Sequence, residues 1–421
     1  MPKVEGTISV VSTKYPRLRS VTAFPVTYSG REMICLRDAS GLAENTIVVP
    51  RSALFIISLL NGKNSVTDIQ AAYMRRFGDM LFSDRIQKFI DDLDKNLFLE
   101  GERFEGYHQR LKAEFKNAST RRFLHLGEET HSEPARLKGE LASYYSHPDG
   151  PGDMLPAIPS SNIKGIMLPH IDYMRGGPCY AWGYRAIEAL GEVETFIILG
   201  VNHMAADPLY SVTPKPFETP LGLMDTDRDL VQALIENCDQ DLLEGEFHHR
   251  SEHSVELQTV WLKDLYAEKD DVKIVPVLCG SFDSFIEQGI SPIENLRVSN
   301  FVSGVKDAIV ASGKKVCLMA SVDLSHIGPQ FGDERPVTRG DLGDIRGADL
   351  ETLRFVESLD REGFWKGVAR DSNKGHICGL SAIYTLLSIL EVREGKLLKY
   401  SQWRDEQGWG CVTFAAMVFC Q

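Results

Sequence analysis

The chain has 421 residues, of which 43% are hydrophobic and 25% are charged, and its formal net charge is −13. This length is more than one ordinary core needs and predicts two domains. The negative charge opposes binding to nucleic acid or to an anionic membrane surface, and no stretch reaches the roughly 20 apolar residues of a membrane span. Eight cysteines without a CxxC pair, together with a start that lacks a secretory pattern, indicate reduced thiols in a cytoplasmic protein.

The first hundred residues predict a small α+β unit. The stretch "TAFPVTYSGREMICLRD" is rich in strand-forming residues around a Ser-Gly turn signal and is typical of a β-hairpin. Three helical patterns follow: the second begins at Ser65 with Asp68 in capping-box spacing, and Ser83 is expected to cap the third. With the short strand "LFLEG", these elements predict a winged-helix-like module over residues 1–101.

Residues 36–78, from "LRDASGLAEN" to "AAYMRRFG", resemble the PqqD-like modules that accompany peptide-modifying enzymes. The resemblance implies a clamp that adds a leader peptide as an edge strand. A small interaction or dimerisation domain is the alternative for this pattern. DNA binding is disfavoured, because the acidic residues of the third predicted helix balance its basic residues and would repel phosphate.

Residues 102–162 are expected to form a weakly helical connection that contains the Pro/Gly/Ser-rich stretch "SHPDGPGDMLPAIPSS". From 163 to 421, strand-length apolar runs alternate with helical patterns, which predicts an α/β fold with helices on both faces of the sheet. The predicted sheet core and all candidate ligands lie in this last part, so a chain that begins near Ser160 is expected to stay soluble and bind metal. The predicted strands are "IKGIMLP", "TFIILG", "VKIVPVLCG", "KKVCLMAS" and "CVTFAAMVF", and the helices include "CYAWGYRAIEAL", "DRDLVQALIEN" and "SAIYTLLSILEV".

Residues that bind metals follow several of these strands. In open α/β sheets, ligands collect beyond the carboxyl ends of the strands, so side chains that follow different strands are expected to meet. Two imidazoles and a thiolate suit a divalent transition metal. Each such residue alone is more often an ordinary loop or core residue, but together they predict a metal site. The residues at strand ends, or just before a predicted helix, are His170, Asn202, His203, Asp323, His326 and Cys378.

From about residue 163 to its end, the chain resembles the Memo family, specifically the bacterial AmmeMemoRadiSam system protein B. The motifs that carry the resemblance are "LPHIDY", "ILGVNH", "EHSVELQTVWL", "IVPVLCG", "SVDLSHIGPQFG" and "ICGLSAIYTLL". It implies the fold of class III extradiol dioxygenases, an α/β sandwich around a mononuclear metal. It also implies a radical SAM enzyme and the Amme protein as partners.

The same resemblance implies roles for individual residues. His170, His203 and Cys378 match the family's metal-binding positions, with Fe(II) as the expected ion and copper or zinc as alternatives. His326 matches the acid–base histidine of the dioxygenases, and Cys378 stands where those enzymes carry a ligating glutamate. Asp323, three residues before His326, is expected to orient that imidazole or to raise its pKa.

The sequence also departs from the family pattern. The usual His-Ala-Gly-Tyr reads His-Ile-Asp-Tyr at 170–173, and Arg175 stands where an aromatic residue is common. The family's early His-Ala-Gly motif corresponds to "LHLGEE" around His125. These changes leave the metal-binding set intact and affect the predicted substrate pocket.

The motif "EHSVELQTVWL" allows two interpretations. Glu252, His253 and Glu256 have helical spacing and could hold a second metal. The favoured interpretation is that Glu252 and His253 line the substrate pocket with Asn202 and Arg175, or orient a metal ligand from behind. The neighbouring residues 248 and 249, both histidines, are expected at the surface.

Two hypotheses of function follow. The first is an oxidoreductase with one iron ion that acts on a phenolic substrate, which a peptide could carry. The second is a metal-binding or peptide-binding adaptor without catalysis. A histidine beside the metal favours catalysis, whereas a thiolate in place of the ligating carboxylate favours redox sensing or metal handling.

Overall fold

The computed structural model describes residues 14–38, 40–43, 45–125, 133–153, 163–190, 192–269 and 271–421. The chain divides into two compact units, Met1–Asn117 and Ala118–Gln421. The division falls inside the stretch that the sequence analysis treats as a connection. Parts of that stretch, including most of "LHLGEE" and the end of "SHPDGPGDMLPAIPSS", lie outside the described residues.

The first unit contains the predicted hairpin. Its two strands are joined by a two-residue turn at Ser29 and Gly30, whose φ values are 50° and 73°. Turns with two positive φ angles match the twist of the flanking strands. The strands of the unit are β1 (Arg17–Leu18), β2 (Thr22–Tyr28), β3 (Arg31–Arg37), β4 (Ile47–Pro50) and β5 (Leu99–Glu100), and the helices are α1 (Ala53–Leu59), α2 (Val66–Phe77), α3 (Ser83–Lys95) and α4 (Glu102–Asn117).

The helix starts in this unit agree with the sequence in one case and differ in another. Ser65 and Asp68 form the predicted capping box at α2. Helix α3 differs, because Ser83 is already its first helical residue and the preceding Phe82, with extended backbone, occupies the cap position without a side-chain hydrogen bond. The core contains Ile69, Ile86, Ile90, Leu93 and Phe98, each at most 1% exposed.

The second unit is built on a sheet with the order β13-β15-β6-β12-β7-β11-β8, and β14 pairs with β15. The four strands β6, β12, β7 and β11 are parallel, and the flanking strands are antiparallel. All five predicted strands are present, whereas the half-buried strand β14 was not predicted. The strands are β6 (Ile163–Leu168), β7 (Thr195–Val201), β8 (Tyr210–Val212), β11 (Lys273–Cys279), β12 (Val316–Ser321), β13 (His326–Ile327), β14 (Glu394–Arg404) and β15 (Cys411–Cys420), with a separate hairpin of β9 (Phe217–Thr219) and β10 (Gly222–Met224).

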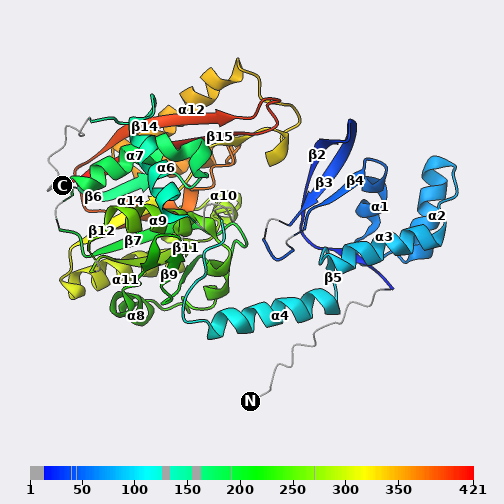
Figure 1. Cartoon of the computed structure of the whole chain (residues 1–421), viewed down its shortest axis with the longest axis horizontal. Helices are drawn as coiled ribbons and strands as arrows, with labels where there is room; N and C mark the ends of the chain where they lie inside the picture. Colours follow the sequence, from blue (N-terminus) through cyan, green and yellow to red (C-terminus); the bar gives the residue numbers. More distant parts are fainter. Residues whose placement is uncertain are drawn as a thin grey trace. The chain divides into compact units, whose positions relative to one another are not determined.

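Helices cover both faces of this sheet, as predicted (Figure 1). Successive side chains of a strand point to opposite faces, and β7 follows this rule. Ile197 and Leu199 face one core, whereas Phe196 and Ile198 face the other. The first core is formed with α8 (Arg228–Asn237), α10 (Asp283–Gln288), α11 (Leu296–Ser312), α12 (Asp341–Glu357), α13 (Arg361–Ala369) and α14 (Leu380–Ile389), and the second with α6 (Pro134–Ser146), α7 (Tyr173–Glu188) and α9 (His253–Leu265).

Two observations bear on the environment of the chain. Among the described residues, no helix combines the length and the apolar character that crossing a bilayer requires. All eight cysteines are free thiols, and all but Cys378 are buried.

Candidate metal centre

The amino terminus of α9 lies directly against the carboxyl end of β7. A Cβ atom on Gly200 would come within 2.5 Å of the Ser254 Oγ atom, so only glycine permits this approach. Ser254 then exchanges hydrogen bonds with the backbone of Val201, at 3.0 and 3.1 Å. This contact brings the residues that follow β7 next to those that begin α9.

Three imidazoles meet at this point. His170 follows β6, His203 follows β7 and His253 is the first residue of α9. One ligand atom from each lies within 4.8 Å of the others, and the ring centroids are 4.9 to 5.1 Å apart. The His170 side chain is only 2% exposed, whereas those of His203 and His253 are about one third exposed, at 31% and 33%. The group is therefore open to solvent on one side.

Each of the three rings is held through its Nδ1 atom. The Nδ1 atom of His170 lies 2.9 Å from the Ser321 carbonyl oxygen, to which it donates. The Nδ1 atoms of His203 and His253 lie 3.0 and 3.1 Å from Oε1 of Glu252. In its neutral form, an imidazole that donates through Nδ1 carries its lone pair on Nε2, so each neutral ring offers Nε2 to an ion. Burial lowers the pKa of His203, but the contacts with Glu252 and Cys378 outweigh burial and raise the pKa well above its usual value, so an ion must displace a proton from this ring.

Glu252 is the support of this arrangement. It caps α9 by accepting hydrogen bonds from the backbone N–H groups of His253 and Ser254, and it also accepts one from the His203 N–H. Burial raises the pKa of the carboxyl group, but the charges of His203 and His253 and their hydrogen bonds to Glu252 together outweigh burial and hold the pKa well below its usual range. The interpretation of Glu252 as the residue that orients a ligand is consistent with this geometry.

Cys378 joins the same group from the loop before α14. Its Sγ atom lies 3.4 Å from Nε2 of His170, and it also contacts the His203 side chain. A Cβ atom on Gly379 would come within 2.8 Å of the Asp323 carbonyl oxygen, so glycine allows this loop to pack against the end of β12. The structure thus brings together the three predicted ligands and adds His253 as a fourth donor.

Asp323 supports His170 rather than His326, contrary to the sequence prediction. Its Oδ1 accepts hydrogen bonds from the backbone of His170 and Ile171, at 3.0 and 3.3 Å, and its Oδ2 lies 3.6 Å from Nε2 of His170. The physical reason is that the chain from 322 to 325 is not helical. Three residues of extended chain span about 10 Å, which separates the carboxylate from the His326 ring. Burial raises the pKa of Asp323 to about 7.

His326 lies beside this group without belonging to the three imidazoles. Its Nδ1 lies 3.0 Å from the Leu324 carbonyl oxygen, and its ring packs edge-on against Phe331 at 5.0 Å. Burial, with a smaller effect from the charge of His203, lowers the pKa of His326 to about 4. The sequence predicted that Asp323 orients this ring or raises its pKa, whereas the Asp323 carboxylate accepts from the backbone of His170 and Ile171.

Asn202 and Arg175, predicted in the substrate pocket, make structural contacts. The side-chain oxygen of Asn202 accepts hydrogen bonds from the backbone of Met204 and Ala205 and so builds the turn after β7. Arg175 pairs with Asp172 at 2.5 Å, and its guanidinium lies 4.6 Å from the centroid of the Trp403 ring.

Glu256, one α-helical turn after Glu252, is not available for a second metal. It is fully buried and forms an ion pair with Arg121, which is also fully buried. Burial lowers the pKa of Arg121 to about 9. Glu256 also accepts hydrogen bonds from the backbone of Leu124 and His125, at 3.0 and 2.8 Å. The ring of His125 lies 5.5 Å from that of His253.

One nearby histidine was misplaced by the sequence analysis. His249 was expected at the surface, but its side chain is buried against Ser211, with Nε2 3.2 Å from the Ser211 carbonyl oxygen. Burial lowers its pKa to about 3. The prediction failed because the short helix Glu246–Arg250 turns this ring toward β8.

A cavity of about 480 Å³ adjoins the group of donors. It lies beyond the carboxyl ends of β7 and β11, and Asn202 and Cys378 both line it. Its other polar lining residues include Asp283, Asn373 and His376. This is the position at which open α/β sheets bind ligands.

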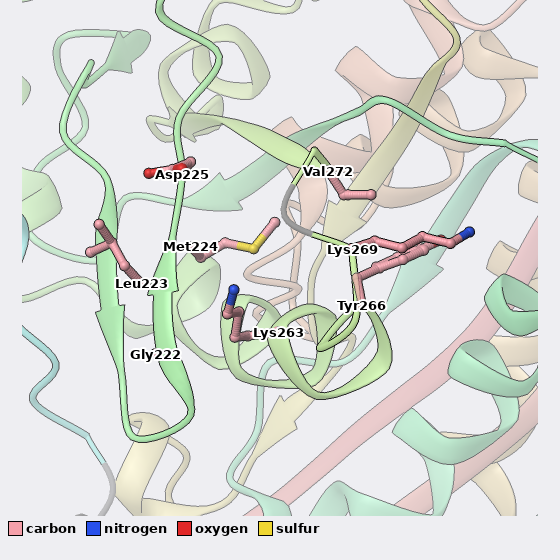
Figure 2. A pocket seen from close by; sticks show the side chains of 8 residues that line it. All are labelled: Gly222, Leu223, Met224, Asp225, Lys263, Tyr266, Lys269 and Val272. Atoms are coloured by element: carbon pink, nitrogen blue, oxygen red, sulfur yellow. The ribbon is translucent and has the colours of Figure 1, made fainter.

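A second cavity, of about 400 Å³, lies between the β9–β10 hairpin and the far end of α9 (Figure 2). Lys263, Tyr266 and Lys269 line one side of it, and Leu223 lies on the hairpin. Lys263 is ten residues after His253, which places it about 15 Å further along the helix. This second cavity is therefore separate from the candidate metal centre.

Comparisons with known proteins agree with this architecture. The family model described as Memo-like protein matches residues 121–418. A MEMO1 family protein of Aquifex aeolicus is 28% identical over 387 residues, which is 91% of this chain and 95% of the relative. A MEMO1 family protein of Methanosarcina barkeri is 30% identical over 255 residues, or 60% of this chain and 83% of the relative.

A solved structure was also found, that of the uncharacterized protein JW3007 from Escherichia coli K12. It has 14% sequence identity and a TM-score of 0.31, and the match covers 61% of this chain and 99% of that one. The family match spans well over half of the chain and includes every donor of the candidate metal centre. The chain therefore belongs to the Memo-like protein family.

Proposed function

We propose that this protein is an oxidoreductase that uses one transition-metal ion. The observation that supports this most strongly is that three imidazoles, each tied through Nδ1, bring one ring nitrogen each within 4.8 Å of the others. Rings held in this way lose little freedom when they bind an ion, because their orientation is already fixed.

The donor set fits such an ion. His170, His203 and Cys378 are the ligands that family resemblance implies, and His253 offers a further imidazole at the same point. Imidazole and thiolate donors suit iron, copper and zinc, and iron is the first choice for a redox reaction. When bound, iron would supply electron transfer and a Lewis acid for the substrate oxygen.

A phenolic compound, free or carried on a peptide, is the proposed substrate. The adjoining cavity of about 480 Å³ falls in the usual size range of ligand pockets, roughly 300–1,000 Å³. His326 is proposed as the residue that takes the proton of the phenolic hydroxyl group. Burial lowers its pKa to about 4, so the ring is neutral at pH 7 and can accept a proton, and it is a weaker base than a histidine of ordinary pKa.

Oxygen uptake after anaerobic loading with Fe(II) tests this function, with a series of catechols as substrates. His326→Ala is expected to keep its metal but to lower turnover about 10²–10⁴-fold, the usual contribution of an acid–base group. His147→Ala, which removes an exposed histidine elsewhere in the second unit, serves as the matched control. If His326→Ala loses its metal as fully as His203→Ala does, His326 is a ligand and its acid–base role is wrong.

The alternative is a metal-binding adaptor without catalysis. Cys378 favours it, because a thiolate at the metal suits redox sensing or metal handling. Stoichiometric iron without oxygen uptake on any catechol would favour the adaptor. The finer proposals on context are a cytoplasmic location and the AmmeMemoRadiSam system, with a radical SAM enzyme and the Amme protein as partners.

For the first unit we propose peptide binding in the manner of the PqqD-like modules. The sheet order β2-β3-β4 makes β2 an edge strand in the described part of the unit. An edge strand can accept a further strand through main-chain hydrogen bonds.

Titration of residues 1–117 with leader peptides from neighbouring reading frames tests this role. We expect shifts of the amide resonances of β2 (Thr22–Tyr28), because its free edge would receive the peptide. The control is the same peptide with alternate backbone amides methylated, which removes its donors. Unchanged amide resonances with every peptide would contradict peptide recognition.

A further inference from the structure

A buried arginine outside the large sheet contacts Glu252, the residue that orients His203 and His253 in the candidate metal centre. Arg121 lies just after the start of the second unit, where it forms a bridge with Phe217 of β9. Its side chain is fully buried. A fully buried arginine is rare in proteins. A guanidinium group does not readily lose its proton, so its buried charge needs several hydrogen-bond or ion-pair partners.

Three partners of the Arg121 side chain lie in the segment that leads into α9 or in its first turn. Its Nε donates to the carbonyl oxygen of His249 at 2.9 Å, and its Nη2 donates to that of Glu252 at 2.8 Å. Its Nη1 pairs with the carboxylate of Glu256 and donates to the carbonyl oxygen of Arg122. One planar guanidinium thus joins the end of the short helix at 246–250, the cap of α9 and its first turn.

These contacts fix the backbone that carries Glu252. The Glu252 carbonyl is held by Arg121, while the carboxylate of the same residue holds the rings of His203 and His253. A shift of this backbone would therefore move two imidazoles at once. Arg121 itself touches none of the donor atoms, so it acts through Glu252.

We propose that Arg121 is a positioning residue of the metal centre, which sets the place of Glu252 and through it the rings of His203 and His253. The inference rests on the proposed metal site and deepens it. It also extends the support of the centre to Arg121, which lies outside the large sheet. Glu256 ties down the segment that follows Arg121 by accepting from the backbone of Leu124 and His125.

Arg121→Lys in the full chain tests the proposal. A lysine ammonium can keep the ion pair with Glu256, but it lacks the rigid fork that reaches two carbonyl groups at once. We expect the variant to fold and its affinity for Co(II) or Zn(II) to fall about 10–100-fold, the usual cost of losing a supporting partner. The absorption spectrum of the Co(II) form and the ring ¹H–¹⁵N signals of His203 and His253 in the metal-free protein are expected to change as well.

Arg122→Lys is the matched control, because Arg122 is the exposed neighbour in sequence. Wild-type metal affinity and unchanged ring signals in Arg121→Lys would overturn the proposal. If this variant does not fold, Arg121→Ala with millimolar guanidinium replaces it: recovery of metal affinity supports positioning, and no recovery overturns it. A wild-type protein that binds no metal contradicts the proposed function instead, and the ring signals still decide the role of Arg121.

Discussion

Alanine at His170, His203 or His253 is expected to remove tightly bound metal while leaving the fold intact. Each substitution deletes one of the imidazoles that meet within 4.8 Å. The loss should exceed the roughly 10–100-fold that removal of a supporting partner costs, because a direct donor is lost. Elemental analysis after dialysis against a chelator measures the remaining metal, and His147→Ala is the control for an exposed histidine.

Absorption spectra of the Co(II) protein test whether Cys378 is a donor in addition to the three imidazoles. Family resemblance implies Cys378 as a ligand, and its Sγ atom lies 3.4 Å from Nε2 of His170. A thiolate-to-metal charge-transfer band in the Co(II) protein that disappears in Cys378→Ser would assign the thiolate as a donor. Asn202→Ala is expected to lower metal content only weakly, because Asn202 builds a turn. Stoichiometric metal in a variant with alanine at 170, 203 and 378 would refute the predicted ligand set.

The residues at the ends of parallel strands could be predicted from the sequence. His170 follows β6, His203 follows β7 and Asp323 follows β12, and these strands are neighbours in the sheet. Apolar runs of strand length predict where the strands lie. Ligands bind beyond the carboxyl ends of the strands in open α/β sheets, so residues that follow these strands are expected to lie together. Contacts of this kind can be predicted from the sequence.

Contacts that depend on long-range packing could not be predicted. His253 is separated from His203 by 50 residues and does not follow a strand, so its approach depends on how closely α9 packs against Gly200. The motif "EHSVELQTVWL" does indicate the role of Glu252, because a glutamate at the start of a helix can accept hydrogen bonds from backbone N–H groups and from a neighbouring imidazole. The partner of Asp323 was mistaken because closeness in sequence implied closeness in space, which holds in a helix but not in an extended segment.

The role of Arg121 was missed for a similar reason. The segment "RRFLHLGEE" was assigned to the weakly helical connection between the two parts of the chain. The partner carboxylate, Glu256, lies 135 residues further on, so nothing near Arg121 in the sequence indicates that it is buried. The second unit starts at Ala118, well before the first strand of the sheet at Ile163.

This division changes the expectation for truncated chains. A chain that begins at Ser160 was expected to stay soluble and bind metal, because the predicted sheet core and every predicted ligand lie beyond that point. Such a chain lacks Arg121 and leaves Glu256 as a buried charge without its ion-pair partner. It also lacks α6, whose residues Leu137 and Leu141 are completely buried in the core beside α7.

We therefore expect a chain that begins at Ala118 to fold and bind metal, and one that begins at Ser160 to do neither. Removal of one partner of a buried ion pair costs about 3–5 kcal/mol. Loss of two buried leucines costs about 1.5–3 kcal/mol each. The sum is comparable with the whole stability of a typical domain, about 5–15 kcal/mol. Near-UV circular dichroism of Trp261 and the aromatic rings stacked on it reports whether each chain folds, and metal content reports whether it binds metal. Glu256→Gln in the longer chain is the control for loss of the charge alone. A folded, metal-binding chain from Ser160 would show that the segment before the sheet is dispensable, and that the carboxyl ends of the strands suffice to build the centre.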